Sequence, residues 1–301
     1  MGRELAGACY RELGAELRQR REKAGLSSAA VADATGWNRS RVSRIESGHI
    51  GIGVVDVIHY LAVCGVRIPT VLDLLRLCED AERELGYWLS PPGEQFGAAL
   101  NSLVFHESTA RAVVLYDPMV INGLLQTADY ARTLISRETW RDEGGIENCV
   151  NIRVARRQIL HRPRPAGFTF VVHEQALRNL VGSGRIMHEQ LLQVVLLSGL
   201  DHVSLRVIPT SEAEQAAFGG SFQLLDFAGE RPMVHLSAQT CGIFLEDAEY
   251  VHEYRQLVPL MSQLAWDQGQ SREFVASLAS EYDRGSRKRH ANIYELEEEH
   301  L

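Results

Sequence analysis

The chain has 301 residues, 45% of them hydrophobic, and a formal net charge of -8 at pH 7. This length and composition predict a globular protein of about two domains. No charged stretch followed by an apolar run opens the sequence, and no apolar run approaches the roughly 20 residues that span a bilayer. We therefore expect a cytoplasmic protein with no membrane contact. The acidic total excludes a surface coated with basic residues, so any DNA contact must be local.

The cysteines and histidines give no sign of a disulfide framework or a metal site. The five cysteines are scattered, odd in number and free of C-x-x-C spacing. None of the eleven histidines forms an H-x-x-x-H pair with an intervening Glu. We expect reduced cysteines that mostly pack, no metal and no cofactor.

Short helices are predicted through the first part of the chain. Leu13 and Leu17 recur at helical spacing in a first helix that ends near Ala24. Ser27 is a candidate N-cap for a second helix, which Gly36 ends. A third helix begins near residue 38, and a fourth spans about 54 to 64.

The third predicted helix turns Val42 and Ile45 inward, which leaves a polar and basic outer face. A short helix, a tight turn with glycine and a second basic helix are typical of the helix-turn-helix, whose second helix lies in the major groove of double-stranded DNA. Arginine suits this role because its fork can bond guanine O6 and N7 together, and backbone N–H groups at a helix start can bind phosphate. The candidate DNA-binding residues are Ser27, Ser28, Asn38, Arg39, Ser40, Arg41, Ser43 and Arg44.

A solvated helix face is the alternative interpretation of these arginines. In that case they pair with Glu46, Asp33 or Glu22, as charges on exposed helices commonly do.

The run from Leu13 to Gly48 resembles the XRE (phage-repressor-like) helix-turn-helix family. It shares the L-G-x-x-L-R opening, G-L-S at the second helix and S-x-V-S-R-I-E-x-G through the third. The resemblance implies that Arg39 and Ser40 take the place of the main base readers. One departure is Ser28, which stands where the family commonly has Gln, so we expect Ser28 to contribute mainly its backbone N–H.

The rest of the chain is predicted to hold a linker, a second domain and a tail. A helix from about Pro69 to Leu85 is followed by a break at S-P-P-G, and the sequence does not determine whether this helix packs on either domain or pairs between subunits. We divide the chain into a helix-turn-helix domain (1–68), a helical linker (69–93), a C-terminal domain (94–283) and a tail (284–301). The tail joins R-K-R-H to E-L-E-E-E-H, a composition typical of disorder.

The C-terminal domain is predicted to mix helices and strands. Helical period runs over 99–118, a helix follows with Thr127 as its N-cap, and another runs from about Glu147 to His161. Strands are predicted at 167–172, 202–209, 220–228 and 232–237, and a helix at 184–200 makes the first two a parallel strand-helix-strand unit. Helices over about 246–266 and 271–283 end the domain. The fold class is therefore multi-domain, an all-α helix-turn-helix domain plus a larger mixed α/β (α+β) domain.

A cluster of arginines is the candidate binding site of the C-terminal domain. Residues three and four apart share a helix face and could form an anion-binding surface. The candidate residues for an effector or partner are Arg153, Arg156, Arg157, Gln158 and Glu174. Simple ion pairing of the arginines with Glu147, Glu174 or Asp201 is the alternative.

Catalytic signatures are missing from the sequence of this domain. Neither a G-x-S-x-G motif nor a phosphate-cradling glycine loop occurs. An enzyme would need Glu174 or His173 to meet the arginines as acid or base. We therefore expect no catalytic residues and no enzyme activity.

Several segments of this domain resemble, in order, the domain of unknown function 5753, which follows XRE-type domains in actinobacterial regulators. They are I-N-G-L-L-Q-T, R-V-A-R-R-Q-I-L, H-E-Q-A-L-R-N-L, V-S-L-R-V-I-P and F-G-G-S-F-Q-L-L-D-F. The resemblance implies regulation, with this domain binding a small partner protein encoded nearby or a small-molecule effector. Two departures are Asn122, in place of the usual Pro, and V-H-L-S-A-Q-T, which lacks the acidic residue that usually follows the strand near Met233.

The sequence thus predicts a sequence-specific transcriptional regulator. A homodimer is expected, because one short recognition helix buries too little surface for selective binding. The alternative is an antitoxin-like protein that sequesters a small partner and autoregulates its operon.

Overall fold

The computed structural model describes residues 7–67, 72–83, 85–89, 96–137, 143–212, 214, 216, 218–238 and 241–298. The chain divides into two compact units, Met1–Ala110 with Leu224–Tyr254, and Arg111–Gln223 with Arg255–Leu301. The S-P-P-G break, predicted at 90–93, lies outside the described residues.

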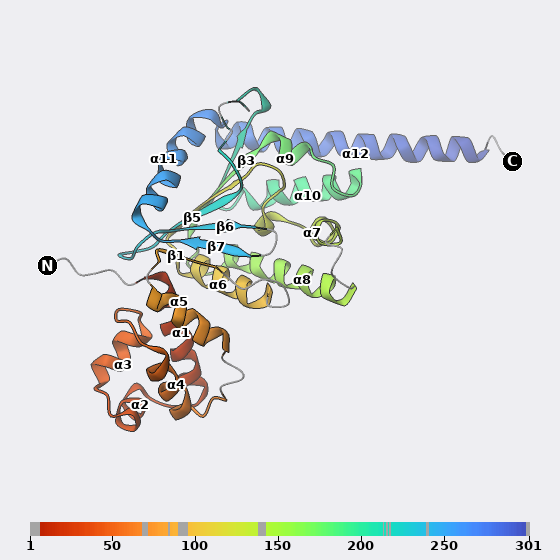
Figure 1. Cartoon of the computed structure of the whole chain (residues 1–301). Coiled ribbons are helices and arrows are strands. Elements are labelled where there is room, and N and C mark those ends of the chain that lie inside the picture. The colour runs from red at the N-terminus through yellow and green to blue at the C-terminus, as the bar shows by residue number, and fades with distance from the viewer. Residues whose placement is uncertain are drawn as a thin grey trace. The chain divides into compact units, whose positions relative to one another are not determined.

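The N-terminal part of the first unit is all-α (Figure 1). It contains α1 (Ala8–Lys23), α2 (Ser28–Thr35), α3 (Arg39–Glu46), α4 (Val54–Val63) and α5 (Leu72–Arg83). The first four helices confirm the prediction. Leu74 and Cys78 of α5 belong to the same core as Leu17 and Ile45, so the joining helix packs on the helix-turn-helix.

Side-chain caps determine where α2 and α3 begin. Ser27 Oγ accepts a hydrogen bond from the Ala30 N–H at 3.1 Å, and Asn38 Oδ1 accepts one from the Arg41 N–H at 2.6 Å. Gly36 ends α2 at a φ of 73°, a left-handed conformation that glycine adopts without the penalty of a Cβ. Local sequence signals therefore account for the tight turn between α2 and α3.

The first unit also holds α6 (Phe96–Thr109) and strands β1 (Tyr87–Leu89), β6 (Met233–Ser237) and β7 (Gly242–Leu245), with β5 (Phe222–Asp226) at its boundary. The strand order is β1-β7-β6-β5, and the β1/β7 and β6/β7 pairs are antiparallel. Strands β5 and β6 confirm the predicted ones. Strands β1 and β7 were not predicted, since alternation cannot be recognised in three or four residues.

The second unit contains the parallel strands β2 (Ala112–Asp117), β3 (Gly167–His173) and β4 (Val203–Ile208), in that order. Helix α10 (Gly184–Leu197) connects β3 to β4, which confirms the predicted parallel unit. Strand β2 corrects the prediction of one helix over 99–118, because α6 ends at Thr109. A short buried apolar run fits a strand or a helix equally well, and here it forms a strand.

The other elements of the second unit are largely helical. They are η3 (Gly123–Leu125), α7 (Ala128–Ile135), α8 (Glu143–Arg156), η4 (Arg157–His161), α9 (Glu174–Arg178), η5 (Thr210–Glu212) and α12 (Gln268–Glu298). Helix α11 (Ala248–Leu264), which contains Pro259, begins in the first unit and ends in the second. Thr127 caps α7 as predicted, because its hydroxyl accepts a hydrogen bond from the Tyr130 N–H at 3.3 Å.

The end of the chain differs from its prediction. Residues beyond 284 were expected to be disordered, yet α12 continues through Glu298. This segment has no Pro and many strong helix formers, and α12 already packs against α10 at its start. A nucleated helix extends through such a sequence at little further cost.

The fold is therefore an all-α helix-turn-helix domain followed by an α+β domain with a mixed sheet of seven strands. Among the described helices, none combines the length and the apolar character that crossing a bilayer requires.

Candidate nucleic-acid interface

Helix α3 presents a polar face to solvent. Its Val42 and Ile45 are buried in the core, so the helical spacing leaves the other positions outside. The exposed residues of this polar face, here called the reading face, are Arg39, Ser40, Ser43 and Arg44. Among the described residues, neither Arg39 nor Arg44 forms an ion pair. The alternative of intrachain pairing is therefore not what the structure holds at these two positions.

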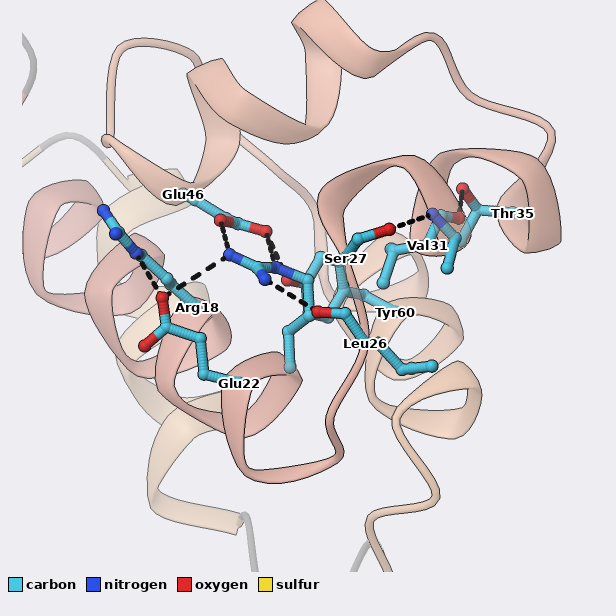
Figure 2. Close-up of polar contacts among 10 residues, drawn as sticks. Arg18, Glu22, Leu26, Ser27, Val31, Thr35, Glu46 and Tyr60 are labelled. Atoms are coloured by element: carbon cyan, nitrogen blue, oxygen red, sulfur yellow. Dashed lines mark hydrogen bonds and ion pairs between the residues drawn. The ribbon is translucent and has the colours of Figure 1, made fainter.

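A buried ion pair joins α1 to α3, and Figure 2 shows the carboxylate of Glu46 at its centre. Arg21 Nε and Nη2 donate to the two carboxylate oxygens of Glu46 at 2.7 and 2.8 Å, and the Tyr60 hydroxyl donates to Glu46 Oε1 at 2.6 Å. Arg21 Nη1 donates to the Leu26 carbonyl at 2.8 Å. Hydrogen bonding to Glu46 raises the pKa of Arg21, so the guanidinium stays charged. A bidentate pair with this many satisfied groups fixes α3 against α1.

Close backbone contact between α1 and α3 depends on glycine. A Cβ at Gly14 would lie 2.3 Å from the Ile45 carbonyl oxygen, and one at Gly48 would lie 2.6 Å from Arg11 Cα. The sequence prediction missed this role. Gly14 itself could have indicated this contact, because a glycine inside a helix destabilises that helix and is therefore expected where another backbone packs closely against it.

Arg41 is engaged on the other side of α3. Its guanidinium forms an ion pair with Asp56 of α4 and lies 4.4 Å from the centroid of the Trp37 ring. A carboxylate and an aromatic face are both favourable partners for a guanidinium. Arg41 thus joins α3 to α4, unlike Arg39 and Arg44.

The remaining predicted DNA-binding residues lie at helix starts. The capping oxygens of Ser27 and Asn38 are occupied by backbone N–H groups of their own helices. Ser28 is the first residue of α2 and is half-buried. Backbone N–H groups in such a first turn carry partial positive charge, which is the feature that suits phosphate. A DNA contact by the Ser28 N–H stays a prediction.

A second polar cluster lies in the second unit, at the loop that follows β2. Arg153 Nη1 donates to Gln126 Oε1 at 3.0 Å, and Arg157 Nη1 donates to the Gln126 carbonyl at 3.1 Å. Arg156 Nη1 lies 3.7 Å from the position of a Cβ on Gly123. The structure thus brings the three arginines, here called the guanidinium cluster, to one loop.

The other predicted members of that site do not join the guanidinium cluster. Gln158 is exposed, and Glu174 accepts hydrogen bonds from Arg178 Nε at 2.6 Å and the Thr210 N–H at 2.8 Å. Over the described part of the chain, no hydrogen bond or ion pair joins Glu174 to the three arginines. Glu147, an expected partner of the cluster, pairs instead with Arg132 at 2.6 Å.

Sequence reasoning missed Asp117, a buried carboxyl at the end of β2. Asn122 Nδ2 donates to Asp117 Oδ2 at 2.9 Å, while Asn122 Oδ1 accepts from the Leu124 N–H at 2.9 Å. Burial raises the pKa of Asp117 to about 7, opposed by the hydrogen bond from Asn122 and by the charge of Arg156. Asn122, which departs from the family pattern, therefore binds this carboxyl. In the other departing segment, residues 239 and 240 lie outside the described ranges.

The capped helices, the tight turn and the exposed basic face define a helix-turn-helix domain, a class of DNA-binding domain. Residues 12–79 match a family described as "Helix-turn-helix domain". Residues 100–277 match the family described as "Domain of unknown function (DUF5753)", and since this match spans more than half of the chain, the chain belongs to that family. No curated protein matches the chain. Among solved structures, one similar chain is the archaeal chromatin protein TrmBL2, at 10% identity over 72% of each chain with a TM-score of 0.28, too low to establish a shared fold.

Proposed function

We propose that this protein is a sequence-specific transcriptional regulator that reads the major groove of double-stranded DNA with α3. The observation that carries the proposal is the reading face, where Arg39 and Arg44 are exposed and have no ion pair among the described residues. Guanidinium groups without internal partners keep their donors for guanine O6 and N7. The buried Arg21 and Glu46 pair supports this role, because base reading requires a helix of fixed orientation.

We also propose that the protein acts as a homodimer. Helix α3 has 8 residues, and a helix of that length is only about 12 Å long, so it spans few base pairs. Two copies on half-sites one DNA turn apart would supply the selectivity that one copy lacks. The net charge of -8 fits recognition of a specific operator, because an acidic surface disfavours binding to other DNA sequences.

For the C-terminal domain we propose binding, without catalysis, of an acidic small partner protein or an anionic small-molecule effector. Support comes from the guanidinium cluster, which converges on the loop after β2. The carboxyl ends of parallel strands are a recurrent place for ligands, and arginine is the residue that best recognises carboxylate and phosphate. An antitoxin-like protein, which sequesters its partner and autoregulates its operon, would use the same surface.

Binding of the full-length protein to its own upstream DNA over a salt series tests the DNA-reading proposal. We expect protection of a short repeated site, and a loss of about 1 to 3 kcal/mol of preference for that site in Arg39→Ala and Arg44→Ala. Arg185→Ala, which changes an exposed arginine of α10, is the control and should keep the preference. Equal affinity of the wild type for a scrambled duplex would contradict the proposal.

Co-purification from a native lysate tests the second domain. A small protein retained by the wild type and by Arg185→Ala, but lost from Arg157→Ala, would support partner binding at the guanidinium cluster. Retention that is independent of Arg157 would place the partner elsewhere.

A further inference from the structure

The first turns of α1 are bound to a part of the first unit that lies within the matched C-terminal family. Glu12 is buried, and its two carboxylate oxygens accept hydrogen bonds from Ser102 Oγ and from His106 Nε2, the latter at 3.1 Å. Both donors lie on α6. The carboxylate of Glu12 has no other hydrogen-bond donor among the described residues, so its burial depends on α6.

Two further contacts join the same end of α1 to the strands. The Ala8 N–H donates to Glu246 Oε2 at 2.6 Å, just after β7. The Arg11 guanidinium lies 4.1 Å from the centroid of the Phe227 ring, just after β5. The contact between Glu12 and α6 is therefore part of a wider attachment of α1.

His106 is suited to hold Glu12 in one position. It is fully buried, and its ring contacts the rings of Trp88, Phe105, Phe227 and Phe244. Its Nδ1 has no partner in the described part of the chain, whereas Nε2 faces the carboxylate. The hydrogen bond to Glu12 therefore requires the proton on Nε2, and the aromatic rings restrict the imidazole to that orientation.

Helix α1 also carries the contacts that position the reading face. Arg21 binds Glu46, and Gly14 lies against the backbone of Ile45 and Glu46. Helix α1 is continuous from Ala8 to Lys23, so backbone hydrogen bonds link the turn that holds Glu12 to the turn that holds Arg21. One unbroken helix thus connects α6 to α3.

We propose that Glu12 and His106 are positioning residues for DNA recognition, which set the orientation of α3 through α1. A change at α6 would then alter the reading face without any contact between α6 and DNA. The DNA part of this inference rests on the proposed function, whereas the mechanical link between α6 and α3 does not.

Three α6 variants of the full-length chain test this link, because none of them changes the helix-turn-helix itself. His106→Phe keeps an aromatic ring but removes the donor to Glu12, and His106→Gln restores an amide donor. Thr109→Ala is the matched control, since among the described residues its hydroxyl bonds only carbonyls of its own helix. Hydrogen exchange without DNA should be about fivefold faster at residues 39–46 in His106→Phe, and close to wild type in the other two. The affinity of His106→Phe for the upstream site should fall about tenfold, with its affinity for a scrambled duplex unchanged.

Faster exchange confined to α6, with residues 39–46 unchanged, would overturn the proposal, because His106 would then only stabilise its own surroundings. Should His106→Phe fail to fold, Ser102→Ala removes one donor to Glu12 and is subject to the same two measurements. Faster exchange of α3 in a protein that shows no preference for its upstream DNA would support the link between α6 and α3 and would contradict the proposed function.

Discussion

Two helices of this protein carry closely spaced arginines, and the structure uses them differently. On α3, Arg39 and Arg44 face solvent without an ion pair in the described residues. At the end of α8 and the start of η4, Arg153 and Arg157 both donate to Gln126. Spacing along a helix determines which arginines share a face, but the element packed against that face determines whether the donors remain available.

Arg41 shows the same effect within a single helix. It lies between the two exposed arginines in sequence, yet Asp56 and Trp37 occupy its guanidinium. The availability of a guanidinium therefore depends on its local partners rather than on the number of arginines nearby. Three substitutions test how far such local partners determine stability and binding.

Glu46→Ala has the largest expected effect. It leaves the Arg21 guanidinium buried without its carboxylate, and breaking a buried pair in this way costs about 3 to 5 kcal/mol. Hydrogen exchange over residues 8–63 of the full chain would show the lost stability. Arg18→Ala removes an exposed pair with Glu22 at 2.8 Å, and we expect no measurable change. Similar losses in the two variants would contradict the structural role of the buried pair.

Asp117→Asn should change how stability depends on pH. Burial raises the pKa of Asp117 from 3.8 to about 7, so its folded pKa lies above its unfolded value. The stabilising contribution is complete below pH 3.8 and is lost as the pH rises through about 7, when the buried carboxyl must ionise. We expect Asp117→Asn to be more stable than the wild type at pH 8, by on the order of 1 to 3 kcal/mol, and closer to it at pH 5. Urea denaturation at both pH values checks this, and a parallel pH dependence in the two proteins would refute it.

Asn38→Ala should have a smaller effect, through the helix rather than through base reading. Asn38 Oδ1 accepts the Arg41 N–H, and loss of an N-cap costs about 1 kcal/mol. We expect weaker binding to the upstream site and to a scrambled duplex alike, and Asn38→Asp should restore both. A selective loss of preference for the upstream site would show instead that Asn38 contacts bases.

Local signals made the first domain predictable. Ser27, Gly36 and Asn38 mark helix ends by their own chemistry, and helical spacing alone places Val42 and Ile45 inside. The same spacing could not show that Arg41 is engaged, because Asp56 lies on the next helix. The pairing of Arg21 with Glu46 was missed for the same reason, since 25 positions separate them.

The second domain was less predictable because its strands are short or buried. The run at β2 has no alternation, so the sequence predicts a helix there and does not reveal Asp117 as a strand-end carboxyl. The guanidinium cluster was found from its spacing, but its contact with Gln126 depends on a loop whose path no local pattern shows. The composition of the charged tail predicts disorder, but composition does not show that the preceding helix, α12, continues through the tail to Glu298.

The most direct measurement compares Arg39→Ala with Arg157→Ala in one assay, the affinity for the upstream site relative to a scrambled duplex. Both remove one guanidinium from the full-length protein. We expect Arg39→Ala to lose about 1 to 3 kcal/mol of preference and Arg157→Ala to keep it, because Arg157 lies on η4 of the second unit and not on α3. Equal losses, or no loss in Arg39→Ala, would contradict the claim that α3 is the helix that reads DNA.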